Sequence, residues 1–178
     1  MKSNEYQKGN FEFDMGMIYA NGIGTEVDFQ KAAHYFRKAA KKGHAQAQFN
    51  LALLYQKGQG VEKDYNKAIY YLEKAANQGH VDAQFNIGLM YYHGKGVEQD
   101  YQKAAHFYEM AANQGQTEAQ FNLGYMYCMA QGVEQNYRKA YDFFEQAAKL
   151  GHQDAKYNLK IVKGYIRDEE KSAPTRKQ

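Results

Sequence analysis

The hydrophobic and polar positions of this chain repeat at an interval of 36 residues, which indicates internal duplication. Glycines recur at this interval, and so do tyrosines that close an apolar stripe. The glycines are Gly43, Gly79, Gly115 and Gly151, and the tyrosines are Tyr19, Tyr55, Tyr91 and Tyr127. Because two residue types keep one period, we divide the chain into repeats at about residues 9–44, 45–80, 81–116 and 117–152.

The first half of each repeat has the hydrophobic spacing of an amphipathic helix. In the repeat at 45–80, Ala47, Leu51 and Tyr55 lie four residues apart, on one stripe of a helix with 3.6 residues per turn. Gly58 and Gly60 follow, and glycine readily adopts the positive φ that ends a helix. The pattern therefore predicts a first helix that ends near residue 57.

The second half of each repeat predicts another helix, which begins after a capping residue. Ala68, Leu72 and Ala76 form its apolar stripe. Asp64 precedes the stripe, where its side chain can accept backbone N–H groups, and Gly79 is expected to stop the helix. The equivalent capping residues in the other repeats are Asp28, Asp100 and Asn136.

A stack of such helix pairs is the fold that this pattern favours. One pair cannot bury its apolar stripe alone, so stability must come from the interfaces between neighbouring repeats. We expect an all-α fold, a right-handed α/α superhelical solenoid of about four helix-turn-helix repeats, followed by a capping helix over residues 153–167. The predicted domain is residues 1–167, and the polar residues 168–178 are expected to form a disordered tail.

The repeated pattern is similar to that of a known family. Its order is Ala-x-x-x-Leu-Gly-x-x-Tyr, Gly-x-Gly-Val, Asp-Tyr-x-Lys-Ala and Ala-Ala-x-x-Gly-His, which resembles the Sel1-like repeat of the tetratricopeptide-like superfamily. The resemblance implies adaptor or scaffold work, with diverse protein partners bound mostly on a concave surface lined by the first helices. Two departures are Ala130, where other repeats have glycine, and glutamates such as Glu62 in place of the family's proline.

Composition and charge exclude some classes of partner. Hydrophobic residues make up 44% of the chain, and the formal net charge is +3, with acids and bases interleaved. No basic stripe indicates nucleic-acid binding, and no apolar run is long enough for a signal core or a membrane span. We therefore expect a cytoplasmic protein that binds neither nucleic acid nor membrane. A monomer is expected, and Met15, Met17 and Ile18 mark the surface most suited to self-association.

The sequence provides no convincing set of residues for catalysis. Its serines are Ser3 and Ser172, both near the ends, and its single cysteine, Cys128, has no evident base partner. His44, His80 and His152 recur at the turns, too far apart for the bonds near 2 Å that one metal ion requires of its ligands. We expect no catalytic, cofactor-binding or metal-binding residues, and no enzyme activity.

Candidate binding residues lie on the face of the first helices opposite the core stripe. Asparagine is unfavourable inside helices, yet it recurs there in successive repeats. We predict that these amides pair with the backbone of an extended ligand, and the alternative is that each bridges to the adjacent repeat. The predicted groove residues are Asn50, Asn86, Asn122, Asn158, Leu53, Leu89, Tyr92, His93, Tyr125, Met129, Asp82 and Glu118.

Charge along this groove narrows the expected ligand. Asp82, Glu118 and Asp154 place acids in the later repeats, where a clamp for a terminal carboxylate would need Lys or Arg. A neutral or basic segment with apolar anchors fits better. Two functions remain open, an adaptor with several partners and a dedicated inhibitor or immunity protein that occludes one toxin or enzyme. Four phenylalanines beside the groove are expected to pack between repeats, namely Phe13, Phe49, Phe85 and Phe121.

Overall fold

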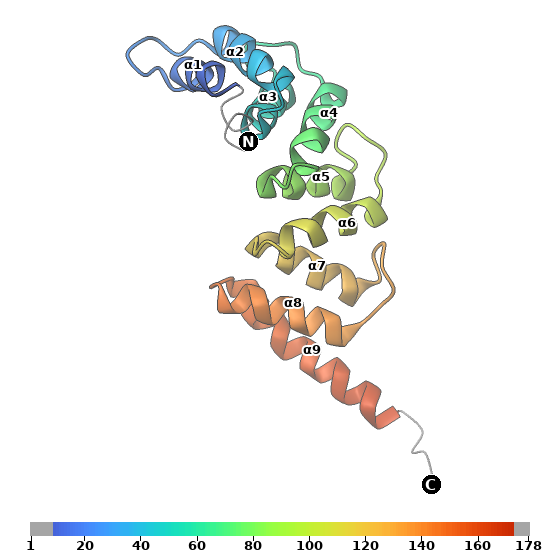
Figure 1. Cartoon of the computed structure of the whole chain (residues 1–178). Coiled ribbons are helices and arrows are strands. Elements are labelled where there is room, and N and C mark those ends of the chain that lie inside the picture. Colours follow the sequence, from blue (N-terminus) through green and yellow to red (C-terminus); the bar gives the residue numbers. More distant parts are fainter. Residues whose placement is uncertain (1–8, 173–178) are drawn as a thin grey trace, which may run out of the picture. The chain divides into compact units, whose positions relative to one another are not determined.

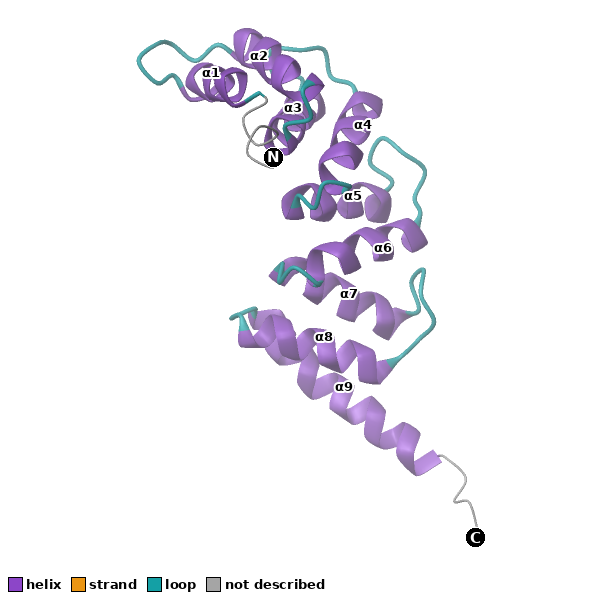
Figure 2. Ribbon diagram, in the orientation of Figure 1, coloured by secondary structure: helices purple, strands orange, loops and turns teal. Residues whose placement is uncertain are grey.

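The computed structural model describes residues 9–172, and all regular structure in that range is α-helical (Figure 1, Figure 2). The chain divides into two compact units, Met1–Glu98 and Gln99–Gln178. The first unit contains α1 (Asn10–Asn21), α2 (Phe29–Lys41), α3 (Ala45–Lys57), α4 (Tyr65–Ala76) and α5 (Val81–His93), and the second contains α6 (Tyr101–Ala112), α7 (Thr117–Met129), α8 (Tyr137–Lys149) and α9 (Gln153–Ser172). This order confirms the predicted all-α solenoid of helix pairs with a final helix. Between residues 9 and 172, no helix is both long and apolar enough to cross a membrane.

The second helix of each repeat begins at the predicted cap. The carboxylate of Asp64 accepts the backbone N–H of Lys67 at 3.0 Å, and the Lys67 ammonium returns to the same carboxylate at 2.9 Å. The backbone N–H and the ammonium group together hold the pKa of Asp64 below its usual value. The same backbone hydrogen bond occurs at the other three caps, Asp28, Asp100 and Asn136.

Glycine ends these second helices, as expected. At the end of α4, Gly79 has φ 86° and donates its N–H to the carbonyl of Ala76 at 2.9 Å. His80 donates to the carbonyl of Ala75 at 3.1 Å. These two bonds form a Schellman motif, which satisfies carbonyls that the end of a helix would leave unpaired.

Histidine caps most of the first helices, a role that the sequence did not reveal. His44 and His80 each accept a backbone N–H on Nδ1, from Ala47 and Ala83 respectively, both at 3.2 Å. His152 does the same at the start of α9, and Gln116 replaces histidine as the cap of α7. The recurring turn histidines are therefore structural residues of the repeat.

The core of the second unit lies between α8 and its neighbours. It is formed by Ala140, Phe144, Ala147, Ala155 and Val162. Gly124 of α7 faces Phe144, and a Cβ at this glycine would lie 2.9 Å from the ring. Gly16 of α1 faces Phe36 in the same way. Small residues on the first helix thus admit a large side chain from the second.

The second glycine of the loop inside each repeat also makes a close contact. A Cβ at Gly60 would overlap the backbone of Phe29 at the start of α2, and one at Gly132 would overlap the backbone of Tyr101. A Cβ at Gly24 would meet nothing within 4 Å. The loop glycines therefore let one repeat rest against the second helix of the repeat before it, and Gly24 makes no such contact.

The end of α7 keeps the geometry of the other first helices in spite of Ala130. Among the described residues, Ala130 is the one non-glycine residue with a positive φ, 53°. Its N–H donates to the carbonyl of Met126, as that of Gly58 donates to Leu54. An alanine in this conformation is strained, because its Cβ approaches the following carbonyl oxygen.

The final helix is longer than predicted. The expected end near Arg167 is wrong, because α9 continues to Ser172. Ile166 and Asp168 stand where other repeats have the glycines of the loop, so nothing in the sequence stops the helix there. The predicted disordered tail is therefore helical over residues 168–172, and residues 173–178 lie outside the described part. The single domain over residues 1–167 stays a prediction.

Candidate partner-binding surface

The predicted groove residues all lie on first helices, and we call them the first-helix surface. In the first unit they come from α3 and α5, and in the second from α7 and α9. Each of these helices begins at a side-chain cap at the same position of the repeat, so equivalent residues lie on the same face of each helix. Each unit therefore offers its own section of this surface.

The asparagines of the first unit are engaged within the fold. Asn50 donates to the Met17 sulfur at 3.3 Å and accepts from Gln46 at 3.2 Å. Asn86 donates to the carbonyl of Asp82 on its own helix at 2.8 Å. Bridging to the adjacent repeat, the alternative to ligand binding, therefore holds for Asn50.

The asparagines of the second unit are placed differently. Asn122 and Asn158 are half-buried, and neither side chain hydrogen-bonds to another residue of the described part. A half-buried amide that has no protein partner is free to bond to water or to a ligand backbone. The two amides available for binding thus lie on α7 and α9.

The apolar residues of the first unit are largely covered. Leu53, Leu89 and Tyr92 are half-buried. His93 is exposed, and its ring lies edge-on to that of Tyr92 with centroids 5.0 Å apart. This section of the surface consists mainly of covered side chains with one polar ring beside them.

The apolar residues of the second unit are exposed. Tyr125 keeps 39% of its accessible surface and Met129 keeps 54%. Tyr157, Ile161 and Tyr165 of α9 are also exposed, at 67%, 38% and 47%. These three are not among the predicted groove residues. The 36-residue period could have identified two of them, because Ile161 is equivalent to Tyr125 and Tyr165 is equivalent to Met129. Because the final helix is predicted only as a capping helix, its exposed apolar residues are not compared with those of the other first helices.

One of the two acidic residues on the surface, Glu118, has a side-chain partner within the fold. Asp82 and Glu118 are both exposed. Nε2 of His152 lies 3.2 Å from a carboxylate oxygen of Glu118. Because Nδ1 of His152 accepts the cap N–H, Nε2 carries the ring proton and donates to Glu118. Glu118 therefore joins α7 to the start of α9 and is only partly available to a ligand.

Two phenylalanines beside the surface, Phe49 and Phe121, stack on the histidine that ends their own repeat and caps the next first helix, and the packing of all four phenylalanines between repeats stays a prediction. Phe49 stacks on His80 with ring centroids 4.7 Å apart, and Phe121 stacks on His152 at 4.2 Å. Both phenylalanines are half-buried. Burial in this contact lowers the pKa of His80, because the charged ring would lose water.

Cys128 is the one thiol of the chain, and it is not activated. It is half-buried at the end of α7, and burial raises its pKa to about 11. At neutral pH the thiol therefore stays protonated and is a poor nucleophile. Among the residues that the structure describes, no three His, Cys, Asp or Glu side chains gather closely enough to hold a metal ion.

Comparisons with known proteins agree on one family. The family model described as Sel1 repeat matches residues 11–44, 45–80, 81–116 and 117–152. A Sel1 repeat protein from Oxalobacter formigenes is 31% identical over 89% of this chain and 65% of its own, with a TM-score of 0.82. No match to this chain is found among curated proteins.

Two further solved structures are similar at 29% identity. The first is c5321, a protective antigen of uropathogenic Escherichia coli strains with an SLR fold, at a TM-score of 0.56 over 96% of this chain and 43% of that one. The second is Helicobacter pylori cysteine rich protein B, at 0.59 over 75% of this chain and 96% of that one. The chain thus spans less than two thirds of the Oxalobacter and Escherichia proteins.

Proposed function

We propose that this chain, which belongs to the Sel1 repeat family, binds a segment of a partner protein on its first-helix surface and does not catalyse a reaction. Sel1 repeat proteins generally mediate protein–protein interaction, and the repeat is generally a non-catalytic scaffold. The observation that carries the proposal is the group of exposed apolar side chains on α7 and α9 of the second unit.

This apolar group has the composition of a binding surface. Tyrosine contributes a large rigid contact with a polar end, and it is enriched among the residues that dominate binding energy. Tyr125, Tyr157 and Tyr165 supply three such rings, and Met129 adds an adaptable apolar side chain. The fold does not bury these residues, so their apolar character supports an interaction with another molecule.

Polar groups around the apolar residues favour an extended segment as the ligand. Asn122 and Asn158 can each donate to and accept from a peptide backbone. Glu118 and Asp154 are exposed acids on the same two helices. A neutral or basic segment with one or two apolar anchors satisfies both features, and a terminal carboxylate does not.

The role that we propose is that of an adaptor, and the number of partners tests it. An adaptor engages several ligands with dissociation constants in the range of about 1 μM, near −8 kcal/mol. A dedicated inhibitor, such as an immunity protein, would hold one ligand at about 1 nM or tighter, near −12 kcal/mol. A single ligand bound this tightly would indicate a dedicated inhibitor that uses the same surface.

The experiment compares three forms of the protein. The wild type, a Tyr125→Ala/Ile161→Ala variant and a Tyr70→Ala variant are used as bait in native lysate, and captured partners are then purified for calorimetry. Tyr70 is a matched control, because it is 49% exposed but lies on α4, a second helix. All three forms must first unfold at similar temperatures.

We expect the double variant to weaken partner binding at least about 30-fold, or about 2 kcal/mol, and the Tyr70→Ala variant to bind as the wild type does. Equal binding by all three forms would place the contact elsewhere and overturn the proposal. Loss of binding in the Tyr70→Ala variant alone would assign the contact to the second helices instead.

A further inference from the structure

The final helix replaces small and aromatic residues of the repeat with lysines. Lys160 occupies the position of Gly124, which contacts Phe144 of the second helix in its repeat. Lys163 occupies the position of Tyr127, whose ring stacks at 5.8 Å on a ring of that same helix. Both lysines are exposed. A further helix packed on α9 in this way would bury two ammonium groups, which is costly without paired carboxylates.

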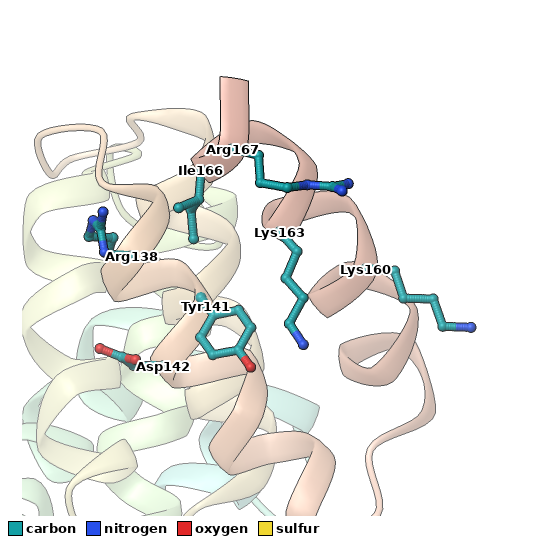
Figure 3. Close-up of a pocket in the computed structure, with 7 residues that line it drawn as sticks. All are labelled: Arg138, Tyr141, Asp142, Lys160, Lys163, Ile166 and Arg167. Atoms are coloured by element: carbon teal, nitrogen blue, oxygen red, sulfur yellow. The ribbon is translucent and has the colours of Figure 1, made fainter. Parts of the chain in front are cut away.

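Positive charge instead gathers around a pocket between α8 and α9. Figure 3 shows this pocket, which has a volume of about 620 Å³. Four cationic side chains line it, Arg138 from α8 and Lys160, Lys163 and Arg167 from α9. Asp142 is the one carboxylate among the lining residues.

Two of these cations have partners within the second unit. Arg138 pairs with Glu170 at 2.6 Å. The Lys163 ammonium lies over the ring of Tyr141, 5.3 Å from its centroid. In Figure 3, Lys163 reaches toward Tyr141, whereas Lys160 and Arg167 extend outward from α9. Lys160 and Arg167 make no ion pair with any residue of the described range, so their charges are open to a ligand.

The wall between the cations is apolar. Tyr141 and Ile166 are half-buried and face the pocket from α8 and α9. A pocket with an apolar wall and a cationic rim fits an apolar side chain that is flanked by carboxylates. The carboxylates would pair with Lys160 and Arg167, and the guanidinium can hold a carboxylate with two parallel hydrogen bonds.

We propose that this pocket is a second protein-binding site, which takes an acidic segment carrying one apolar side chain. The first-helix surface has acids at Glu118 and Asp154 and suits a neutral or basic segment, so the two sites differ in the charge that they accept. The pocket therefore goes beyond the proposed function and does not depend on it.

Charge excludes the C-terminal residues of the chain as the occupant of the pocket and disfavours nucleic acid. The last six residues of the chain carry Arg176 and Lys177 and no acid, so they do not complement the pocket. Nucleic acid requires several phosphate contacts along a basic track, whereas Asp142 and Glu170 interrupt the cations of this pocket. An acidic peptide needs only a few local charges and one apolar contact.

The test uses a fluorescent peptide of Asp and Glu with one central Phe, and its binding is followed by anisotropy. The pocket variant is Lys160→Glu/Arg167→Glu, supported by the milder Lys160→Gln/Arg167→Gln. The matched control is Lys41→Glu/Lys95→Glu, which makes the same change of charge at exposed lysines of the first unit. We expect the wild type to bind, the charge-reversal pocket variant to lose at least about tenfold in affinity, and the control to change less than about twofold.

Other peptides and variants separate this site from the first-helix surface. A peptide with Asn and Gln in place of the acids should lose binding, and one with Ala in place of Phe should bind more weakly. The Tyr125→Ala/Ile161→Ala variant should keep the acidic peptide. The proposal is overturned if the wild type does not bind at about 1 mM peptide, if both charge-reversal variants lose affinity equally, or if a short single-stranded oligonucleotide binds more tightly than the peptide.

Discussion

The two units are built from the same repeat pattern, but they offer different surfaces on their first helices. In the first unit, Asn50 and Asn86 are engaged by hydrogen bonds within the unit, and Leu89 is half-buried. In the second unit, Tyr125 and Ile161 are exposed, and the asparagines beside them are free of protein hydrogen bonds. The same helical positions thus contribute to the internal structure of one unit and to the open surface of the other.

This difference shows which positions hold the scaffold and which can vary. The alanines at one position of successive first helices are fully buried in both units, and these are Ala47, Ala83, Ala119 and Ala155. The position six residues later carries half-buried leucines in the first unit, Leu53 and Leu89, and the exposed residues Tyr125 and Ile161 in the second. A repeat protein can therefore change its ligand without changing its interfaces.

The largest expected effect tests the scaffold that the two units share. Gly60→Ala in the first unit and Gly132→Ala in the second should each lower the free energy of unfolding by about 3 kcal/mol or more, because the new Cβ overlaps backbone and φ is positive. Gly24→Ala, with open space around it, should cost about 1 kcal/mol. Urea unfolding followed by circular dichroism measures all three. If Gly24→Ala is as damaging as Gly60→Ala, the loop contact does not hold neighbouring repeats together.

The next effect tests the difference between the surfaces. With a purified partner, Tyr125→Ala should raise the dissociation constant about 30-fold, or about 2 kcal/mol, because an exposed tyrosine loses its whole contact with the ligand. Leu89→Ala should change it less than about threefold, since Leu89 is already half-covered. Calorimetry provides both values. A larger loss for Leu89→Ala would mean that the first unit carries the main contact.

A smaller effect concerns the end of α7. Ala130→Gly should raise the free energy of unfolding by about 1 kcal/mol, because glycine adopts a positive φ without a Cβ clash. The reverse change in the first unit, Gly94→Ala, should lower it by a similar amount, since Gly94 has φ 64°. Thermal and urea unfolding check both variants. An unchanged or lower stability for Ala130→Gly would show that the alanine is not strained.

The smallest effect concerns pH and the caps of the first helices. Burial lowers the pKa of His80 in the folded chain below the ordinary value for histidine, which is about 6.5. Its stabilising contribution is therefore complete above about pH 6.5 and declines as the pH falls below that value, because the unfolded chain then binds the proton more readily. Gln116 fills the same position in the second unit and does not titrate.

Unfolding measured between about pH 7.5 and about pH 5.5 tests this cap, with His80→Gln as the comparison. The variant should lose part of the pH dependence of the wild type and keep the helix, as Gln116 does. The range stays above the titration of the Asp64 cap, whose pKa is also lowered, by the backbone N–H and side chain of Lys67. An identical pH profile for both forms would contradict a titrating His80 cap.

Much of the architecture could be predicted from local pattern. Helices are capped at Asp64 and its equivalents and end at Gly58 and Gly79. These interactions span only a few residues of the chain, so the residue types at these positions reveal them. The candidate surface was only partly predictable. Equivalent positions in successive repeats identify which residues share a face of the first helices. They do not determine whether an amide such as that of Asn50 bonds to a neighbouring residue or to a ligand.

By itself, the sequence determined the helix pairs, the boundaries of the helices before α9, their stacking and the family, because these follow from a 36-residue period and from interactions local to each helix end. Tertiary structure alone decided which first helices expose their apolar residues, that the turn histidines are caps, and that α8 and α9 enclose a cationic pocket at Lys160 and Arg167. Exposure and charge clustering depend on distances between helices that are far apart in the chain, and periodicity carries no information about those distances.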